Sequence, residues 1–284
     1  MKSKILVAIA LFFMTLTILV TWANPAKTTE INQFAPVLGC AVKPPVNTSL
    51  PAALTSIPIT LDRFRKLILT PESPALAAPK TNKIYKPKEV IALAAASNYG
   101  DRYLQDITGQ PAQRAPIIVL HETVAPANIV INYFQTFQSD EDDQASYHTL
   151  IAIDGTIIYF VPPDKRAFGA GDSVFADALG KESVQTNPKY PSSVNNFAYH
   201  ISLETPADGM NDGTSHSGYT ESQYRSLAWL VAKTDVPIER ITTHRIVDRS
   251  GSRIDPRSFN FSIFQERLIE YPRTSEIFIG CPLP

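Results

Sequence analysis

The stretch Ile117-Ile118-Val119-Leu120-His121-Glu122 decides the fold, and the rest of the chain is best understood from it outward. Its four apolar residues favour a short buried strand, and a histidine follows that strand directly. A second short strand, Ile241-Thr242-Thr243, is followed in the same way by His244. Side chains at strand ends can converge at one edge of a sheet, where a rigid scaffold presents them to solvent. We therefore expect His121 and His244 to meet.

Helical and strand patterns alternate on both sides of these two strands, from about residue 110 to residue 275. Asp154-Gly155 between two apolar runs predicts a hairpin with a two-residue turn. Apolar spacing and a capping box at Thr220–Gln223 predict helices. This pattern indicates an α/β domain with a mixed central β-sheet flanked by helices. The predicted helices are 126–137, 220–233 and 262–270, and a further strand is 199–203.

Prolines recur through residues 24–110, which discourages long helices and central strands there. Within this Pro-rich N-terminal extension, the alanine-rich segment 88–98 is the one stretch that favours a helix.

The first 23 residues have the features of an export signal: two lysines, an apolar run over 5–20, and a small residue, Ala23, at a plausible cleavage point. An uncleaved N-terminal anchor is the alternative, because the run is near the length of a membrane span. Either form places the rest of the chain outside the cytoplasm, where disulfides persist. We expect Cys40 and Cys281 to pair; two free buried thiols are the alternative.

Charge and composition exclude some classes of protein. Among 284 residues there are 26 Lys+Arg and 27 Asp+Glu, which gives a formal net charge of -1. A large basic field for nucleic acid is thus excluded, and the 44% hydrophobic content argues against wholesale disorder. We expect no nucleic-acid partner, no membrane contact beyond the N-terminal segment, and a monomer.

Asp255, eleven residues after His244, completes a candidate metal site with His121. Two imidazoles and one carboxylate form a catalytic zinc set that leaves a fourth position for water, whose pKa zinc lowers towards ~7. Because 123 residues separate the two histidines, spacing alone leaves ordinary structural histidines as the alternative.

Seven short motifs, in one order between about residues 115 and 270, make the pattern more specific. They are 118–123, 146–151, 164–171, 201–204, 220–229, 243–245 and 253–256. Together they resemble the zinc-dependent N-acetylmuramoyl-L-alanine amidases, the family of the phage lysozyme-type amidases and the peptidoglycan recognition proteins.

The resemblance implies an amidase/peptidoglycan-recognition-like fold, Zn²⁺ as cofactor, and hydrolysis of the amide between N-acetylmuramic acid and L-alanine of peptidoglycan. With the export signal and the Pro-rich stretch, it divides the chain into a signal peptide or anchor (1–23), the extension (24–110) and a zinc amidase catalytic domain (111–284). The export signal implies that the protein lies in the periplasm or outside the cell. A non-catalytic peptidoglycan-binding protein of the same fold, or an amidase for soluble (anhydro)muropeptides, are the alternatives.

Carried over position by position, the resemblance implies that His121, His244 and Asp255 bind zinc. It implies that Glu204 is the general base and that Tyr147 orients water or the tetrahedral intermediate. For Glu204 a strand-end salt bridge is the alternative, and for Tyr147 a plain core position.

The chain departs from the family pattern at three places. Arg253 stands where a lysine commonly stabilises the oxyanion, and a changed reach could alter rate or specificity. Glu122 replaces a frequent second histidine, and either points away from the metal or accepts an imidazole N–H. Phe168-Gly169 replaces Trp-His. We interpret His148 and His200 as structural and His216 as a loop residue near the groove.

Overall fold

The computed structural model of the chain describes residues 40–45, 59–66 and 85–281. The predicted signal segment 1–23 lies outside these ranges, as does much of the extension. The described residues all belong to one unit, Leu38–Pro284. No helix within them is both long enough and apolar enough to cross a bilayer.

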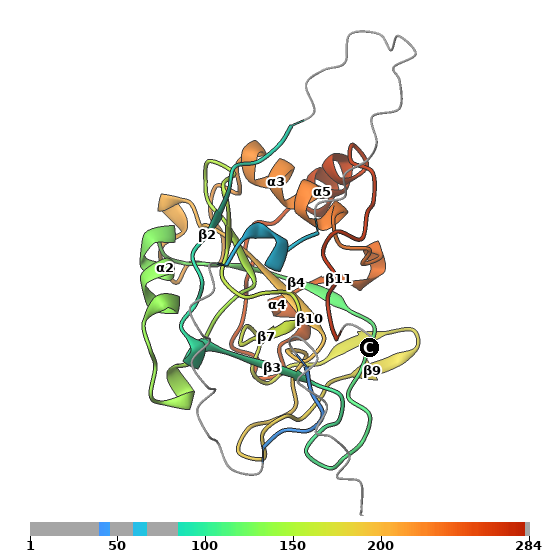
Figure 1. Ribbon diagram of the computed structural model, residues 1–284. Helices are drawn as coiled ribbons and strands as arrows, with labels where there is room; N and C mark the ends of the chain where they lie inside the picture. Colours follow the sequence, from blue (N-terminus) through green and yellow to red (C-terminus); the bar gives the residue numbers. More distant parts are fainter. Residues whose placement is uncertain (1–39, 46–58, 67–84, 282–284) are drawn as a thin grey trace, which may run out of the picture. The chain divides into compact units, whose positions relative to one another are not determined.

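A six-stranded mixed sheet forms the centre of this unit, as the sequence predicts (Figure 1). In spatial order the strands are β11 (Ile241–Thr243), β4 (Ile117–Glu122), β10 (Ala198–Leu203), β5 (Thr149–Ile151), β6 (Ile157–Tyr159) and β2 (Glu89–Ile91). The first four strands in this order run parallel, β6 is antiparallel to β5, and β2 is parallel to β6.

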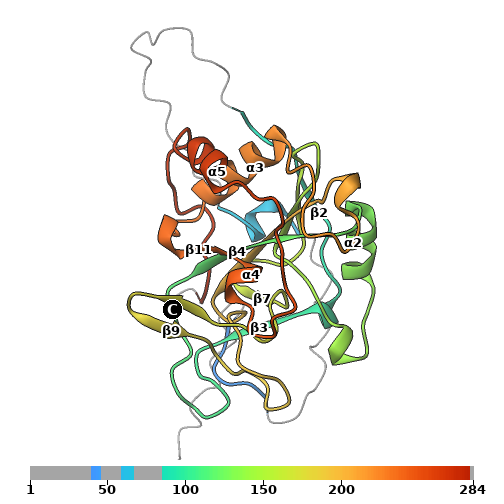
Figure 2. The same cartoon turned by 180° about the vertical axis from the view of Figure 1, so that it is seen from behind.

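Helices cover both faces of this sheet (Figures 1 and 2). Ile118 and Leu120 of β4 point to one face, where they share a core with α3 and α5. Ile117 and Val119 point to the other face, where Val247 of α4 joins them. On that second face, α2 packs near the β2 edge. The helices are α2 (Ala127–Gln135), α3 (Glu221–Ala232), α4 (His244–Val247) and α5 (Phe261–Leu268).

Two small sheets and several 3₁₀ turns complete the described part of the chain. One sheet joins β1 (Cys40–Ala41), β3 (Tyr99–Tyr103) and β7 (Lys165–Ala167), and the other joins β8 (Phe175–Asp177) and β9 (Gly180–Glu182). The 3₁₀ turns are η1 (Leu61–Arg63), η2 (Ala96–Asn98), η3 (Glu141–Asp143), η4 (Ala207–Gly209) and η5 (Ile238–Arg240).

The helix predicted over residues 88–98 is wrong. Glu89–Ile91 is an edge strand on β6, and the N–H groups of Ala92 and Ala94 continue the pairing by donating to Tyr159 and Phe160 carbonyls at 2.9 and 3.1 Å. The alanine-rich composition favours a helix only weakly, and the open edge of β6 supplies tertiary hydrogen bonds that outweigh it. The extension therefore contributes strands to the same unit.

The β5–β6 hairpin is confirmed, but its turn is longer than the predicted two residues. The Ala152 N–H donates to the Thr156 carbonyl at 2.9 Å, so that Ile153, Asp154 and Gly155 form the turn, and the Gly155 N–H donates back to the Ala152 carbonyl at 2.8 Å. Gly155 has φ +87°, a left-handed conformation that glycine adopts without strain.

A disulfide links Cys40 to Cys281, as the sequence predicts, with their Cα atoms 5.5 Å apart. It connects β1 to the C-terminal segment across a separation of 241 residues.

Candidate metal centre

His121, His244 and Asp255 meet as the sequence predicts. One ligand atom from each lies within 4.8 Å of the others. The Nδ1 atom of His244 is 3.0 Å from Asp255 Oδ1, and the Nδ1 atom of His121 is 3.3 Å from Asp255 Oδ2. All three side chains are shielded from solvent, and His121 is completely buried.

Strand register accounts for this convergence. β11 lies parallel to β4 with Thr243 opposite Leu120, so the residues that follow, His244 and His121, emerge at the same edge of the sheet. Asp255 is brought to them by the segment after α4, where the Arg245 N–H donates to the Asp255 carbonyl at 2.9 Å.

The charges of the three side chains suit a cation. Burial lowers the pKa of His121 to about 4, so its imidazole is neutral at pH 7. Burial alone would raise the pKa of Asp255, but the adjacent imidazoles of His121 and His244 hold it well below its ordinary value. The site therefore offers a neutral nitrogen donor from His121 and an ionised carboxylate from Asp255, beside the second imidazole of His244, and imidazole with carboxylate is the ligand chemistry of Zn²⁺.

An unsatisfied atom at the centre also fits a metal. The buried Nδ1 of His121 has no hydrogen-bond partner, despite its approach to Asp255. Buried polar atoms without partners are rare in folded proteins because desolvation is costly. A cation bound between His121, His244 and Asp255 would satisfy this atom.

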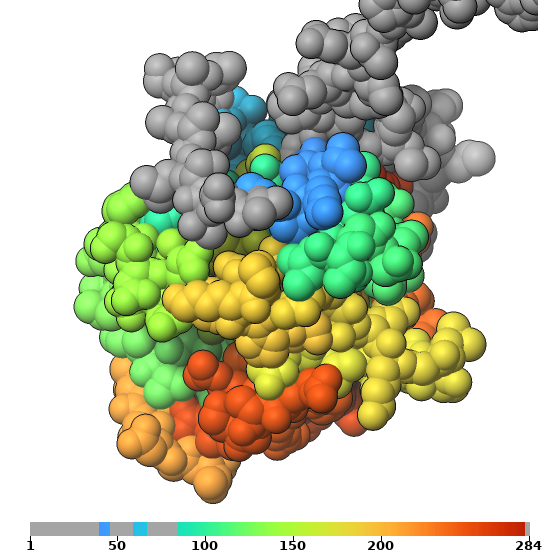
Figure 3. Space-filling view, turned by 90° about the horizontal axis from the view of Figure 1, so that it is seen from below, coloured from blue at the N-terminus to red at the C-terminus, as the bar shows by residue number. Residues whose placement is uncertain are grey.

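The centre opens into a groove of about 1570 Å³, lined by His244 and Asp255 among others. Segments distant in the sequence form this face: those near residues 100, 140, 190 and 250 (Figure 3). Tyr147 and Arg253 also line the groove, so the structure brings them to the metal ligands. The ring of Tyr147 stacks on His121 with centroids 4.5 Å apart.

Comparison with known proteins agrees with this site. Residues 111–258, which contain all three candidate ligands, match the family model described as N-acetylmuramoyl-L-alanine amidase. The chain belongs to this amidase family. No curated protein matches the amidase.

Solved structures similar to this amidase are distant from it. A selenomethionine derivative of AmpD is 20% identical, with 66% of this chain and 98% of that chain covered and a TM-score of 0.44. LysC from Clostridium intestinale URNW is 20% identical, with coverages of 65% and 99% and a TM-score of 0.38. AmiD from E. coli is 18% identical, with coverages of 55% and 58% and a TM-score of 0.41.

Glu204, the predicted general base, is not brought into the groove of the amidase. Its two carboxylate oxygens accept hydrogen bonds from the Ala127 N–H at 2.8 Å and the Ile153 N–H at 2.9 Å. The carboxylate thus joins the start of α2 to the β5–β6 turn, and the groove lining does not include it. The β10 residue that lies beside His121 is Ser202, whose hydroxyl is buried without a partner.

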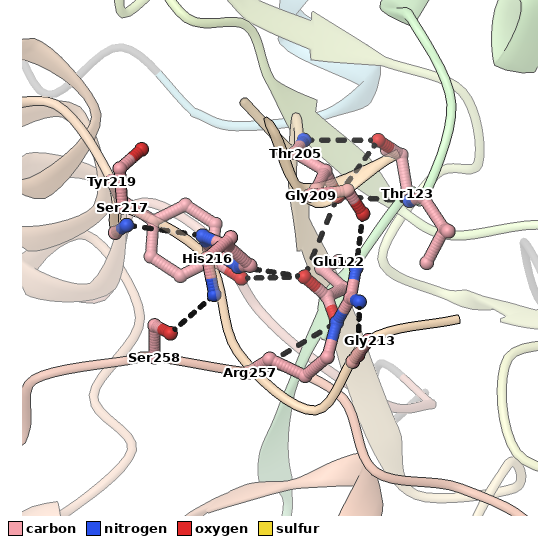
Figure 4. A network of polar contacts seen from close by, with 12 residues as sticks. Glu122, Thr123, Thr205, Gly209, Gly213, His216, Ser217, Tyr219, Arg257 and Ser258 are labelled. Carbon is pink, nitrogen blue, oxygen red and sulfur yellow. Dashed lines mark hydrogen bonds and ion pairs between the residues drawn. The ribbon is translucent and has the colours of Figure 1, made fainter. Parts of the chain in front are cut away.

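Glu122 turns away from the metal ligands into a buried polar network (Figure 4). Its carboxylate accepts from Arg257 Nε at 2.6 Å and from the Tyr219 hydroxyl at 3.1 Å, and it contacts His216 Nε2 at 3.0 Å. Arg257 in turn donates to the Asn211 carbonyl at 2.9 Å. Glu122 therefore anchors the loop before α3 to the segment that carries Asp255.

Two histidines interpreted as structural lie behind the centre. His148 is buried against Arg102, 3.2 Å from its Nη2, away from the groove. His200 contacts a ligand: its Nδ1 lies 2.9 Å from His121 Nε2. His200 and Tyr199 point to opposite faces of the sheet, as alternation along a strand predicts. The face on which His200 lies is the face of His121. The parallel register of β10 and β4 decides this, and it cannot be read from one strand.

Proposed function

We propose that this chain is an exported, zinc-dependent N-acetylmuramoyl-L-alanine amidase that acts on peptidoglycan or its muropeptides. The observation that carries the proposal is the convergence of His121, His244 and Asp255 at the floor of an open groove. Two neutral nitrogens and one carboxylate leave room for a further ligand on zinc, as a catalytic site requires. When bound, zinc supplies Lewis-acid chemistry for hydrolysis of an amide.

Tyr147 is suited to donate a hydrogen bond to the substrate. Burial raises the pKa of Tyr147 above its ordinary value, so its hydroxyl keeps its proton at neutral pH. The ring is held against His121, which directs a protonated donor to the same groove as the ligands. Such a donor stabilises the negative charge that develops on an amide oxygen during hydrolysis.

Arg253 supplies a fixed positive charge at the groove. It is exposed, and its guanidinium forms no ion pair with any residue that the structure describes. A cation beside the reacting carbonyl stabilises the same oxyanion, and arginine can do so with two N–H groups at once. We assign Arg253 the function that the family commonly gives to lysine.

Export is supported by two features. Residues 1–23 have the pattern of a signal peptide, and the Cys40–Cys281 disulfide suits an oxidising compartment. The periplasm or the cell exterior is also where peptidoglycan lies. We propose that the mature amidase acts there as a monomer.

Digestion of purified peptidoglycan tests the proposal directly. The zinc-loaded amidase should release stem peptides with a free L-alanine amino terminus, detected by mass spectrometry, and a chelator should abolish their release. A parallel digestion of soluble anhydromuropeptide, the ligand class named for the AmiD complex, ranks the two substrates. Binding to peptidoglycan without any product would instead identify a non-catalytic binding protein and refute the amidase assignment.

A further inference from the structure

His200 lies behind the metal centre and contacts only one of its ligands. Both rings are completely buried, and His121 Nε2 is 2.9 Å from His200 Nδ1. The two residues come from adjacent parallel strands, β4 and β10, on the same face of the sheet. This contact leaves the other ring nitrogen of His121, Nδ1, facing Asp255 and His244.

The contact decides which nitrogen of His121 can bind a metal. A neutral imidazole carries one N–H and one lone pair. If His200 Nδ1 accepts from Nε2–H of His121, the lone pair of His121 lies on Nδ1 and points into the centre. In the opposite tautomer, Nδ1 carries the proton and points it at Asp255, which blocks the metal.

His200 is in a position to accept because its Nδ1 lies at hydrogen-bonding distance from His121 Nε2 and its ring is packed among other buried residues. Its backbone N–H donates to His148 Nδ1 at 2.9 Å, and the His148 ring stacks on it with centroids 5.7 Å apart. The ring of His200 is therefore packed against two other buried rings, those of His121 and His148.

The space for His200 exists because residue 169 is glycine. A Cβ atom on Gly169 would lie 2.6 Å from both Cγ and Nδ1 of His200, well inside van der Waals contact. Any other residue at 169 would displace the imidazole. Gly169 is also a place where the chain departs from the Trp-His pattern. The imidazole of His200 on β10 occupies the space that a side chain at residue 169 would need.

We propose that His200 is a positioning residue of the metal centre, which accepts the Nε2 proton of His121 and thereby presents Nδ1 of His121 to the metal. The inference rests on the proposed zinc site. Partners that hold the second nitrogen of a metal-binding histidine typically change metal affinity by about 10- to 100-fold when they are removed.

Zinc affinity of two His200 variants tests this inference. His200→Leu fills the space but cannot accept a hydrogen bond, whereas His200→Asn can present an amide oxygen near the position of Nδ1. We expect zinc to bind about 10- to 100-fold more weakly to His200→Leu, measured by chelator competition, and His200→Asn to recover most of the loss. Ile201→Val, on the opposite face of β10, is the control for general destabilisation and should bind zinc as the unmodified amidase does.

The outcomes separate the inference from the proposed function. An unmodified chain that binds no zinc refutes the zinc site itself. Normal affinity in His200→Leu, or equal loss in both His200 variants, refutes the positioning function alone. Nitrogen NMR of the unmodified, zinc-loaded amidase needs no variant: coordination through Nδ1 of His121 supports the inference, and coordination through Nε2 overturns it.

Discussion

At the scale of single residues, the candidate metal centre depends on which atom each side chain turns toward the others. His121 is the clearest case, because His200 occupies its Nε2 and the unsatisfied Nδ1 faces the other ligands. Asp255 is the only carboxylate of the triad and lies within 3.0–3.3 Å of both imidazoles. Its negative charge offsets part of the charge of a divalent cation, so we expect it to dominate metal retention.

Asp255→Ala should reduce bound zinc from about one equivalent per chain to nearly none, because two neutral imidazoles hold a divalent cation poorly. Elemental analysis of the purified protein measures this. Asp235→Ala removes an exposed carboxylate outside the groove lining and should keep full zinc content. Full occupancy in Asp255→Ala would show that the ligand set is wrong.

At the scale of elements, residues other than the three candidate ligands hold the pieces of the site together. The parallel register of β11 and β4 brings His244 and His121 to one edge of the sheet, and the register of β10 on β4 places His200 on the same face as His121. Glu122 and Arg257 join the end of β4 to the segment after Asp255. Glu204 joins the end of β10 to the first turn of α2, where a carboxylate also interacts favourably with the helix dipole.

Glu204→Gln distinguishes an anchor from a general base. An amide can accept only one of the two backbone N–H groups well, so as an anchor the change should lower the free energy of unfolding by about 1–2 kcal/mol and leave turnover per folded molecule within severalfold. Loss of a general base would instead lower turnover by about 10²- to 10⁴-fold with stability unchanged. The two backbone hydrogen bonds favour the first outcome.

Denaturant unfolding and single-turnover hydrolysis, measured on the same preparation, decide between these outcomes. Glu221→Gln is a matched control, because Glu221 also lies in the first turn of a helix, α3, but outside the groove lining.

At the scale of the whole molecule, the described part of the extension and the C-terminal segment are tied to the catalytic fold. β2 extends the central sheet, β1 pairs with β3, and the disulfide closes a loop of 241 residues. Arg65 adds a buried link, since it pairs with both Glu89 and Glu276. Breaking the disulfide should therefore destabilise the fold more than it disturbs the metal centre.

Replacing both cysteines, as Cys40→Ser with Cys281→Ser, should lower the free energy of unfolding by about 2–5 kcal/mol. A long closed loop restricts the unfolded chain strongly, although native strain reduces the effect. Chemical denaturation of oxidised, reduced and substituted protein measures the change. Zinc content should be retained in the folded variant. Equal stability of the oxidised and reduced forms would contradict this expectation.

Much of the fold and of the site could be predicted from local patterns. The strand before His121, the capping box at Thr220 and the order of the motifs each depend on neighbours in sequence, and all reappear in the structure. The helix predicted for the alanine-rich segment 88–98 was wrong, because a weak helix propensity cannot reveal the open edge of a strand 68 residues further along the chain. The function of Glu204 cannot be read from its place in the sequence, because a strand-end carboxylate can lie in a groove or bind a helix terminus.

By itself the sequence determined the amidase family, the α/β class and the three ligand candidates, since these rest on residue types in a fixed order. Only the tertiary structure decided which acids reach the groove, which nitrogen of His121 is free, and why residue 169 is glycine. Those answers depend on the register between β4 and β10 and on the space between segments, and both are set by contacts between residues far apart in the chain.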